Sequence, residues 1–264
     1  MAAKTIVLVT GGKSHPPLPQ KQNNANLPQA SSGIGFELAA QLMAKGTYHV
    51  LMGSRSSERG TAAVKELEKR NLPGSITMLP LDVTNDSTIE TAATTVEEIH
   101  GHLDMLVNNA GIGALTPPLR QQMRDAFDAN ATGPAVVTTA FGPLLEKSTS
   151  EHRRIVNISS GMGSLARCLD TTSPMYGVQQ VQYRASKAAL SMVTACQWVE
   201  YGKMGIKVFA YDPGFTVSGL GPHNKAEHGA RLPSETVGPL MDVLEGKRDA
   251  EAGLFLHNTG VYPW

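Results

Sequence analysis

The chain has 264 residues, 41% of them hydrophobic, and its 23 Lys and Arg residues balance its 23 Asp and Glu residues. This length allows one large buried core, and without a basic block or stripe we do not expect a nucleic acid partner. No apolar run reaches the roughly 18 residues of a membrane span, the opening run is too short for a signal sequence, and the two cysteines lack CxxC spacing, so we expect a cytoplasmic protein without membrane association.

Short, nearly continuous apolar runs alternate along the chain with segments whose apolar residues recur every three or four positions. The short runs are typical of strands buried on both faces of a parallel sheet, and the longer segments are typical of helices. The predicted strands are residues 5–10, 48–53, 75–81, 103–109, 154–160, 206–212 and 253–257. The predicted helices are residues 35–45, 57–71, 87–100, 119–146, 176–203 and 234–245. The pattern, with no linker, predicts one α/β domain over residues 1–264, a doubly wound Rossmann-type fold with a seven-stranded parallel sheet flanked by helices.

The first predicted strand ends in a glycine-rich turn that is interrupted. Removing Lys13 to Gln29, together with one of Gly12 and Ala30, leaves T-G-A-S-S-G-I-G directly before the first helix. Glycines in such a turn let backbone amides approach a pyrophosphate, and the N-terminus of the helix favours its negative charge. The residues that we expect to bind a dinucleotide here are Gly11, Ser32, Gly33, Ile34 and Gly35.

The interrupting tract, residues 13–29, is rich in Pro, Gln and Asn and has no apolar pattern, so we expect it to be irregular and exposed. Lengthening the loop from about 4 to about 22 residues costs only about 1.5 kcal/mol, so the fold should survive while cofactor binding is in doubt. The codons possible at Gly12-Lys13-Ser14, Ala25-Asn26 and Gln29-Ala30 include a splice donor, a branch sequence and an acceptor. We therefore interpret the tract as a translated, unspliced short intron, the alternative being a genuine lid or regulatory loop.

The second predicted strand is followed by Ser54 and Arg55, about twenty residues beyond Gly35, where a dinucleotide site reads the adenosine ribose. An acidic residue there would accept a hydrogen bond from a free 2′-hydroxyl, whereas the guanidinium of Arg55 suits a 2′-phosphate. The sequence thus predicts NADP, with NADPH preferred over NADH. Arg55 could instead be an ordinary solvated residue of a strand-helix turn.

In the fifth predicted helix, Tyr183 and Lys187 are four positions apart and share one face. A tyrosine that exchanges protons near neutral pH needs its pKa lowered by about 3 pH units, or about 4 kcal/mol. One ammonium about 4 Å away supplies about that much at an effective dielectric constant near 20, and an oxidised nicotinamide adds a second positive charge. The Tyr-x-x-x-Lys pattern often arises by chance, so it gains weight from the upstream motifs and from Ser160 at the end of a strand. Tyr176, which has no lysine four residues later, is a poor rival.

Further short motifs follow the split turn along the chain: LDVT at 81–84, NNAG at 108–111, Asn130, ISS at 158–160, YRASK at 183–187 and DPGFT at 212–216. Together, and in this order, the motifs resemble those of the short-chain dehydrogenase/reductase family over essentially the whole chain. The closing stretches PGFTVSGLGPHN and GLFLHNTGVYPW are similar to those of fungal members, many of which are NADPH-dependent ketoreductases of secondary metabolism.

The resemblance implies a catalytic set of Asn130, Ser160, Tyr183 and Lys187. Tyr183 would donate a proton to a carbonyl oxygen as hydride arrives from the nicotinamide, and Lys187 would also hold the ribose hydroxyls. Ser160 would orient that oxygen, and Asn130 would hold a water that connects Lys187 to solvent.

The resemblance also implies further cofactor contacts, each with an alternative role. Asp82, beside Val83, would receive the adenine amino group or simply cap a turn, and Asn109 would serve binding or packing. Thr216 and Ser218 would clamp the carboxamide or be ordinary polar loop groups. The complete expected cofactor set is Gly11, Ser32, Gly33, Ile34, Gly35, Arg55, Asp82, Val83, Asn109, Tyr183, Lys187, Thr216 and Ser218.

The predicted function is that of an NADP-dependent oxidoreductase, transferring hydride from NADPH to a small-molecule ketone or other carbonyl, or oxidising an alcohol in reverse. The alternative is a non-catalytic NADP-binding regulator or an inactive isoform, because of the interrupted turn.

We expect the long loop between Ser160 and Tyr183 to wall the substrate pocket, and residues 217–232 to close over it. No metal is expected, because the histidines are scattered. Packing of the two long helices against their copies would give a homodimer or homotetramer.

Overall fold

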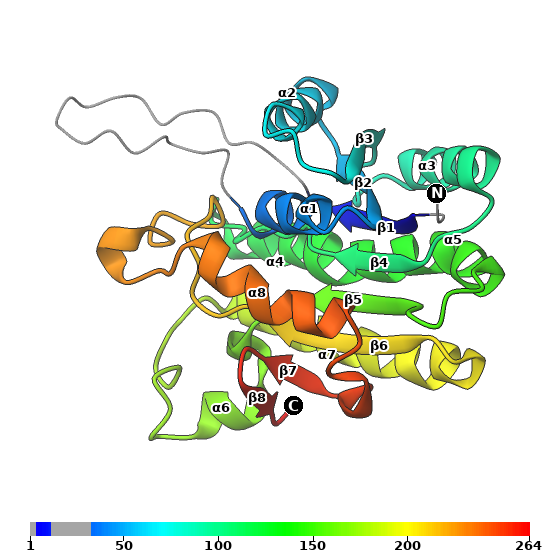
Figure 1. Ribbon diagram of the computed structural model, residues 1–264. Helices are drawn as coiled ribbons and strands as arrows, with labels where there is room; N and C mark the ends of the chain where they lie inside the picture. The colour runs from blue at the N-terminus through cyan, green and yellow to red at the C-terminus, as the bar shows by residue number, and fades with distance from the viewer. Residues whose placement is uncertain (1–3, 12–32) are drawn as a thin grey trace, which may run out of the picture.

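One mainly parallel sheet organises the chain. The computed structural model describes residues 4–11 and 33–264; the predicted insertion at residues 13–29 and the predicted binding residue Ser32 lie outside the described residues. The strand order is β3-β2-β1-β4-β5-β6-β7-β8 (Figure 1). The strands are β1 (Thr5–Thr10), β2 (Tyr48–Ser54), β3 (Ser75–Pro80), β4 (Met105–Asn108), β5 (Arg154–Ile158), β6 (Lys207–Asp212), β7 (Phe255–His257) and β8 (Gly260–Tyr262).

The predicted Rossmann-type fold is confirmed, but the predicted count of seven strands was wrong by one. Strands β1 to β7 pair in parallel, and β8 turns back to pair antiparallel with β7, for example Leu256 with Val261. β7 is equally short but contains a buried apolar run, whereas no residue of β8 is buried, so no continuous apolar run marked β8 in the sequence.

The strand order reverses beside β1, and this reversal positions the site. From β1 the chain moves through β2 to β3 at one edge, then returns to place β4 on the other side of β1. The connections after β1 and β4 therefore leave the sheet in opposite directions, which opens a crevice at the carboxyl ends of these strands.

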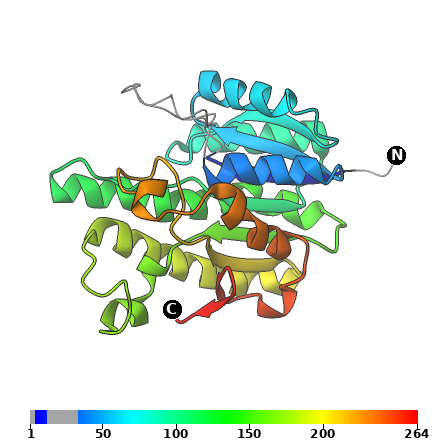
Figure 2. The ribbon, with the colours of Figure 1, turned by 60° about the vertical axis from the view of Figure 1, so that its left-hand side comes forward.

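Helices cover both faces of the sheet (Figures 1 and 2). On one face pack α1 (Ile34–Ala44), α2 (Ser57–Glu68) and α8 (Pro233–Leu244), which share one buried hydrophobic cluster with the strands. On the other face pack α3 (Asp86–His100), α5 (Gly133–Lys147) and α7 (Val181–Tyr201), which share the second cluster. In the described part of the chain, no helix is long and apolar enough to cross a membrane.

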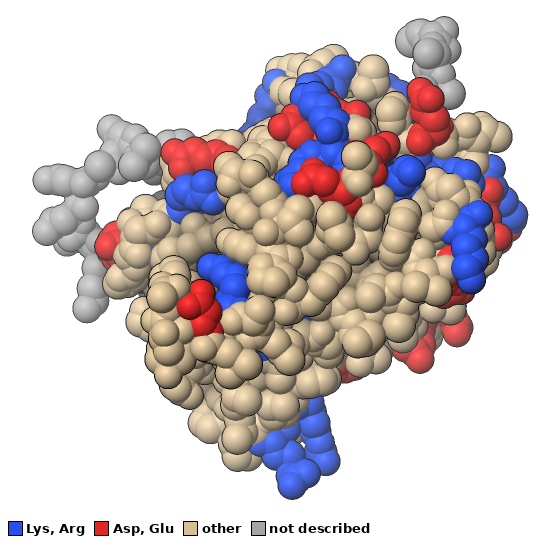
Figure 3. All heavy atoms as spheres, turned by 90° about the horizontal axis from the view of Figure 1, so that it is seen from below, with Lys and Arg blue, Asp and Glu red and all other residues tan. Residues whose placement is uncertain are grey.

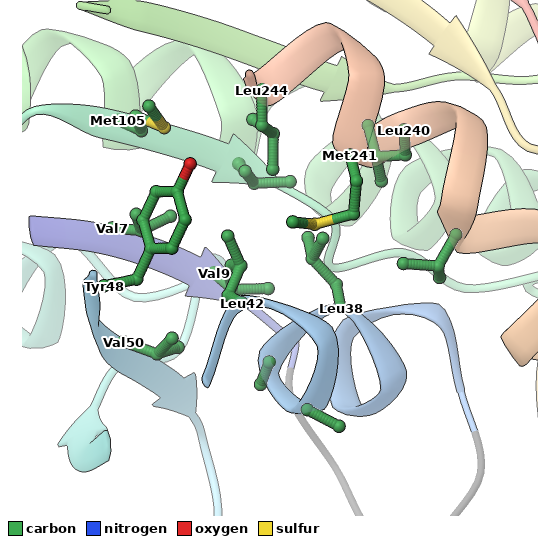
Figure 4. Packing of buried hydrophobic residues seen from close by; sticks show 14 of the residues in the cluster. Val7, Val9, Leu38, Leu42, Tyr48, Val50, Met105, Leu240, Met241 and Leu244 are labelled. Carbon is green, nitrogen blue, oxygen red and sulfur yellow. The ribbon is translucent and has the colours of Figure 1, made fainter. Parts of the chain in front are cut away.

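Alternate residues of β1 serve the two clusters. Val7 and Val9 belong to the cluster under α1 and α8, whereas Ile6 and Leu8 belong to the other, as the two-residue period of a strand requires. Figure 4 shows side chains from α1 and α8 converging over β1 and its neighbours; the labelled residues of the two helices are Leu38, Leu42, Leu240, Met241 and Leu244.

The predicted helix at 119–146 is broken in the structure. It consists of α4 (Leu119–Phe127), the π-helical turn η1 (Asp128–Thr132) and α5. Pro134 has no N–H to donate, which interrupts the α-helical hydrogen bonds at this point. The Gly133 N–H bonds the Asp128 carbonyl five residues back, as in a π-helix.

The predicted helix at 176–203 begins late. Gln180 has a φ of 99°, outside the helical region, so α7 begins at Val181 and Tyr176 lies in the preceding loop. That loop contains the short helices η2 (Gly161–Gly163) and α6 (Leu165–Leu169).

Candidate active site

A cavity of about 560 Å³ opens at the carboxyl ends of the central strands. One end is lined by the glycine-rich turn and by Arg55, and the other by Ser160, Tyr183 and Lys187. Its position is the crevice at the switch in strand order, where doubly wound folds bind ligands.

The two halves of the split glycine turn meet at this cavity. Gly11, at φ 75°, follows β1, and a Cβ built on Gly35 in α1 would lie 3.5 Å from the Gly11 carbonyl oxygen and 2.5 Å from Asn109 Nδ2. A Cβ on Gly11 would lie 2.7 Å from the Ala110 Cα. Only glycine fits such a position, so the backbone remains open to a ligand. Gly11, Gly33, Ile34 and Gly35 all line the cavity, as predicted residues of one loop should.

Two arginines line the cavity beside β2 and α2. Arg55 follows β2, and Arg59 lies one turn into α2, whose N-cap Ser56 accepts a hydrogen bond from the Arg59 N–H. Arg59 was not predicted from the sequence, because it lies in the first turn of α2 and only the fold brings it to the same cavity as Arg55. Two guanidinium groups fit a phosphate ester at this end of the cavity.

Asp82 and Val83, after β3, line the same end. Asp82 Oδ1 accepts hydrogen bonds from the Thr84 N–H at 3.1 Å and the Thr84 hydroxyl at 2.8 Å. The turn-capping role of Asp82 is therefore present in the structure, and adenine recognition stays a prediction.

Asn109 joins the ends of two central strands. Its Nδ2 donates to the Thr10 carbonyl at 2.8 Å, and its backbone N–H donates to the Thr10 hydroxyl at 3.0 Å. Asn109 lines the cavity as well, so packing and binding are compatible roles for this residue.

The predicted proton donor lies in the first turn of α7, beside the carboxyl end of β5. Tyr183 and Lys187 are 7% and 4% exposed, and both line the cavity together with Ser160. The Lys187 ammonium donates to the Ile158 carbonyl at 2.8 Å and lies 5.8 Å from the centre of the Tyr183 ring. The Ser160 hydroxyl accepts from the Met162 N–H at 3.2 Å. The structure thus brings the predicted tyrosine, lysine and serine together.

The protein's own groups do not lower the pKa of Tyr183 as the sequence argument expected. Burial raises the pKa of Tyr183, the Asp212 carboxylate raises it further, and a hydrogen bond with Ser160 opposes both. Burial lowers the pKa of Lys187 to about 8, with Asp212 opposing this. The physical reason is desolvation, which disfavours the phenolate and the ammonium alike. At neutral pH the phenol is protonated and the ammonium is charged, which suits proton donation.

Asn130 lies behind the cavity wall, in η1. Its Oδ1 accepts from the Ile112 N–H at 2.8 Å, and its Nδ2 donates to the Ile112 carbonyl at 2.9 Å and to the Ser186 hydroxyl at 3.0 Å. A Cβ on Gly111 would lie 3.2 Å from Asn130 Oδ1 and 3.7 Å from Lys187 Nζ, so the two residues flank this glycine. The Asn130 amide is already hydrogen-bonded to Ile112 and Ser186. A water that connects Lys187 to solvent, as the sequence predicted, would therefore need hydrogen-bond partners besides this side chain.

The loops after β4 and β6 meet at the cavity. Leu115 and Leu220 line the cavity, and a Cβ on Gly113 would lie 2.6 Å from the Leu220 carbonyl oxygen. Thr216 and Ser218 also line it; the Thr216 hydroxyl donates to the Gly214 carbonyl at 2.9 Å. Of the segment expected to close over the pocket, the lining residues are Ser218, Gly219, Leu220 and Asn224.

The prediction for the long loop before Tyr183 was wrong. None of residues 161–182 is among those lining the cavity. The loop instead packs on the end of the chain, where the Ser164 hydroxyl donates to the Pro263 carbonyl at 2.7 Å and the guanidinium of Arg167 lies 4.0 Å from the Tyr262 ring centre. In the part of the chain that the structure describes, no group of His, Cys, Asp and Glu is arranged to hold a metal ion.

Comparisons with known proteins agree with this architecture. A family model described as short chain dehydrogenase matches residues 29–228. The short-chain dehydrogenase anuI of Penicillium roqueforti is 38% identical over 231 residues, covering 81% of this chain and 91% of that protein. The short-chain dehydrogenase/reductase tropE of Talaromyces stipitatus is 32% identical, covering 98% and 97%. The crystal structure of an NADPH-bound carbonyl reductase from chicken fatty liver superposes with a TM-score of 0.78 at 28% identity, covering both chains fully.

Proposed function

This chain belongs to the short-chain dehydrogenase/reductase family of oxidoreductases, and we propose that it transfers hydride from NADPH to a ketone, with Tyr183 as the proton donor. The observation that carries the proposal is the convergence of Ser160, Tyr183 and Lys187 in one cavity with the glycine-rich turn and Arg55. When bound, NADPH supplies the hydride. Tyr183 gives its proton to the carbonyl oxygen, Ser160 donates a hydrogen bond to that oxygen, and Lys187 keeps a positive charge beside it.

We propose NADPH rather than NADH because Arg55 and Arg59 both face the end of the cavity that the ribose of adenosine would occupy. A guanidinium binds a 2′-phosphate through charge-assisted hydrogen bonds. The NADPH in the chicken carbonyl reductase supports this choice. Gly11, Gly33, Ile34 and Gly35 would hold the pyrophosphate, Asp82 and Val83 the adenine, and Asn109, Thr216 and Ser218 would contact the nicotinamide half.

The proposed substrate is a small-molecule ketone without a negative charge. The loops after β4 and β6 contribute the uncharged residues Ile112, Leu115, Thr116, Ser218, Leu220 and Asn224, and the carboxylates Asp125 and Asp212, which line the same cavity, disfavour an anion. The fungal relatives and the closing stretches of the chain support a role in fungal secondary metabolism. Residues 1–264 act as one domain in this proposal.

We also propose that residues 13–29 are the translation of an unspliced short intron. The family match begins at residue 29 and omits β1, although β1 pairs with both β2 and β4 in the middle of the sheet. A tract that separates β1 from the rest of the family pattern explains this. Sequencing the transcript tests the idea: the dominant message should lack the codons for residues 13–29, and a dominant message that retains them contradicts it.

The functional test compares NADPH oxidation by this chain and by a version without Gly12 to Gln29, using a panel of neutral aromatic and aliphatic ketones. We expect turnover in the shortened version and tighter binding of NADPH than in the full chain, because the turn is then continuous. Binding of NADPH without turnover of any ketone, in both versions, contradicts the reductase and favours the NADP-binding regulator.

A further inference from the structure

A buried carboxylate lies beside the catalytic groups and has no assigned role. Asp212, the last residue of β6, is 8% exposed and lines the same cavity as Tyr183 and Lys187. Its Oδ2 accepts from the Gly161 N–H at 2.9 Å, and its Oδ1 accepts from the Gly214 N–H at 2.8 Å. Each carboxylate oxygen is therefore held by a backbone amide from a different loop.

These two loops carry opposite sides of the site. Gly161 directly follows Ser160, and Gly214 lies two residues before Thr216. A Cβ on Gly161 would lie 3.0 Å from Asp212 Oδ2 and 3.0 Å from the Tyr262 ring, so the first loop is packed closely around the carboxylate. Since a charged acceptor forms stronger hydrogen bonds than a neutral one, ionised Asp212 fixes Ser160 relative to the loop after β6.

Asp212 is surrounded by titratable and charged side chains from every element packed around it. These are Tyr183 and Lys187 on α7, Arg167 on α6, Tyr211 on β6, His257 on β7 and Tyr262 on β8. Burial raises the pKa of Asp212, while the two backbone amides, Arg167 and His257 lower it. Burial is the larger effect, so the pKa of Asp212 lies above its ordinary value, while the two amide donors and the Arg167 guanidinium stabilise the carboxylate form.

We propose that Asp212 is a positioning residue of the active site, whose buried carboxylate joins the loop carrying Ser160 to the loop carrying Thr216 and places one carboxylate in the cavity that Lys187 and Tyr183 line. The catalytic meaning of this arrangement rests on the proposed reductase function. A site that keeps both protons at neutral pH is prepared for ketone reduction, in which Tyr183 must begin as a neutral acid. The reverse oxidation needs the phenolate, which the charge of Asp212 disfavours.

The negative charge of Asp212 determines the direction in which the pKa values of Lys187 and Tyr183 change when it is removed. The carboxylate raises the pKa of Lys187 against the larger effect of burial, and it raises the pKa of Tyr183. Removing the charge should therefore lower the pKa of both groups. Lys187, with a pKa of about 8, titrates in a range where the folded protein can be studied.

The test titrates the Lys187 side chain by NMR in protein carrying ¹³C-labelled lysine, with its signal assigned by comparison with Lys187→Met. No ketone or NADPH is needed, so the result is independent of the proposed function. In Asp212→Asn we expect the Lys187 midpoint to fall by about one pH unit. The matched control is Asp170→Asn, which removes an exposed carboxylate after α6 and should leave the midpoint unchanged.

An unchanged Lys187 midpoint in Asp212→Asn overturns the proposal, as does an equal fall in Asp170→Asn. If Asp212→Asn does not fold, Asp212→Ser replaces it, because a hydroxyl can still accept from one of the two amides. Asp212→Glu keeps the charge and should keep the midpoint near that of the unchanged protein.

Once a ketone substrate is found, the pH at which alcohol oxidation reaches half its maximum should also fall in Asp212→Asn. Failure of every ketone would reject the reductase function but not the Lys187 result.

Discussion

Lys187 links the electrostatics of the site to a pH dependence. Burial lowers its pKa to about 8, while the pKa of Tyr183 is raised above its ordinary value. The ammonium is thus the first of the two groups to lose its proton as the pH rises. Without it, the developing negative charge on the carbonyl oxygen and the phenolate loses its nearest cation.

We therefore predict that kcat/KM for ketone reduction is constant below about pH 7 and falls about tenfold per pH unit above a midpoint near 8. The measurement is a pH profile of NADPH oxidation at constant ionic strength. Lys203→Met, which removes an exposed lysine after α7, should keep the same profile. A midpoint near the ordinary lysine value of about 10.4 would contradict the desolvation argument.

Arg55 is expected to select the cofactor. Hydrogen bonds to a charged group contribute about 1.5–3 kcal/mol, so Arg55→Ala should raise the KM for NADPH by about 10- to 150-fold. The KM for NADH should change little, because it has no 2′-phosphate. Steady-state measurements with both cofactors decide this, with Arg120→Ala on the exposed side of α4 as control. An equal rise for both cofactors would mean that Arg55 supports the fold rather than the phosphate.

Most of the residues predicted for the site line one cavity, and they could be singled out from the sequence because their chemistry repeats in short local patterns. Tyr183 and Lys187 lie on one helical turn, and the glycines lie where a strand meets a helix. The roles of Arg59 and Asp212 depend on contacts made in three dimensions. The pKa of Tyr183 was also misjudged, because burial and the Asp212 charge depend on residues far apart in sequence.

At the scale of elements, helices over the sheet hold the cavity walls in place. Leu240 of α8 is fully buried in the cluster that joins α8 to α1 and β1 (Figure 4). α1 begins at the glycine-rich turn, so its packing against α8 also fixes that turn.

Leu240→Ala should lower the free energy of unfolding by about 2–5 kcal/mol, because it leaves a cavity in close-packed surroundings. Leu169→Ala on α6, where the leucine is 78% exposed, should change it by no more than about 0.5 kcal/mol. Urea unfolding followed by circular dichroism compares the two. Similar losses in both variants would show that the α1–α8 contact is not a main source of stability.

Most strands and helices could be predicted, because their apolar residues repeat with a regular period. The exceptions have local causes. The turn at Asp128–Thr132 follows from Pro134 and the contacts of Asn130, and the late beginning of α7 follows from the positive φ of Gln180. Periodicity cannot reveal a change in hydrogen-bond pattern or a single backbone angle, and it misses a strand such as β8 that has no buried residue.

At the scale of the molecule, the ends of the interrupted turn still meet. A Cβ added to Gly35 would lie 3.5 Å from the Gly11 carbonyl oxygen, so the two glycines are neighbours although 23 residues separate them in the sequence. The logarithmic dependence of loop closure on length accounts for this tolerance in the fold.

Several apolar side chains remain exposed on α7, among them Val181, Met192 and Val199, each more than half exposed. Seen from the side on which α6 and β8 lie, much of the surface carries no charged side chain (Figure 3). Light scattering should give at least twice the mass of the 28.1 kDa chain, consistent with the proposed homodimer or homotetramer. A monomer at micromolar concentration would contradict this assembly.

The most direct test of the proposed chemistry compares Tyr183→Phe with Tyr176→Phe. Both changes remove one phenolic hydroxyl, but Tyr183 is buried beside Ser160 whereas Tyr176 is exposed in the loop before α7. We predict that Tyr183→Phe loses about 10²- to 10⁴-fold of the ketone reductase rate while its NADPH affinity is kept. Tyr176→Phe should retain the full rate. Turnover by Tyr183→Phe at the rate of the unchanged protein would contradict the role of Tyr183 as the proton donor.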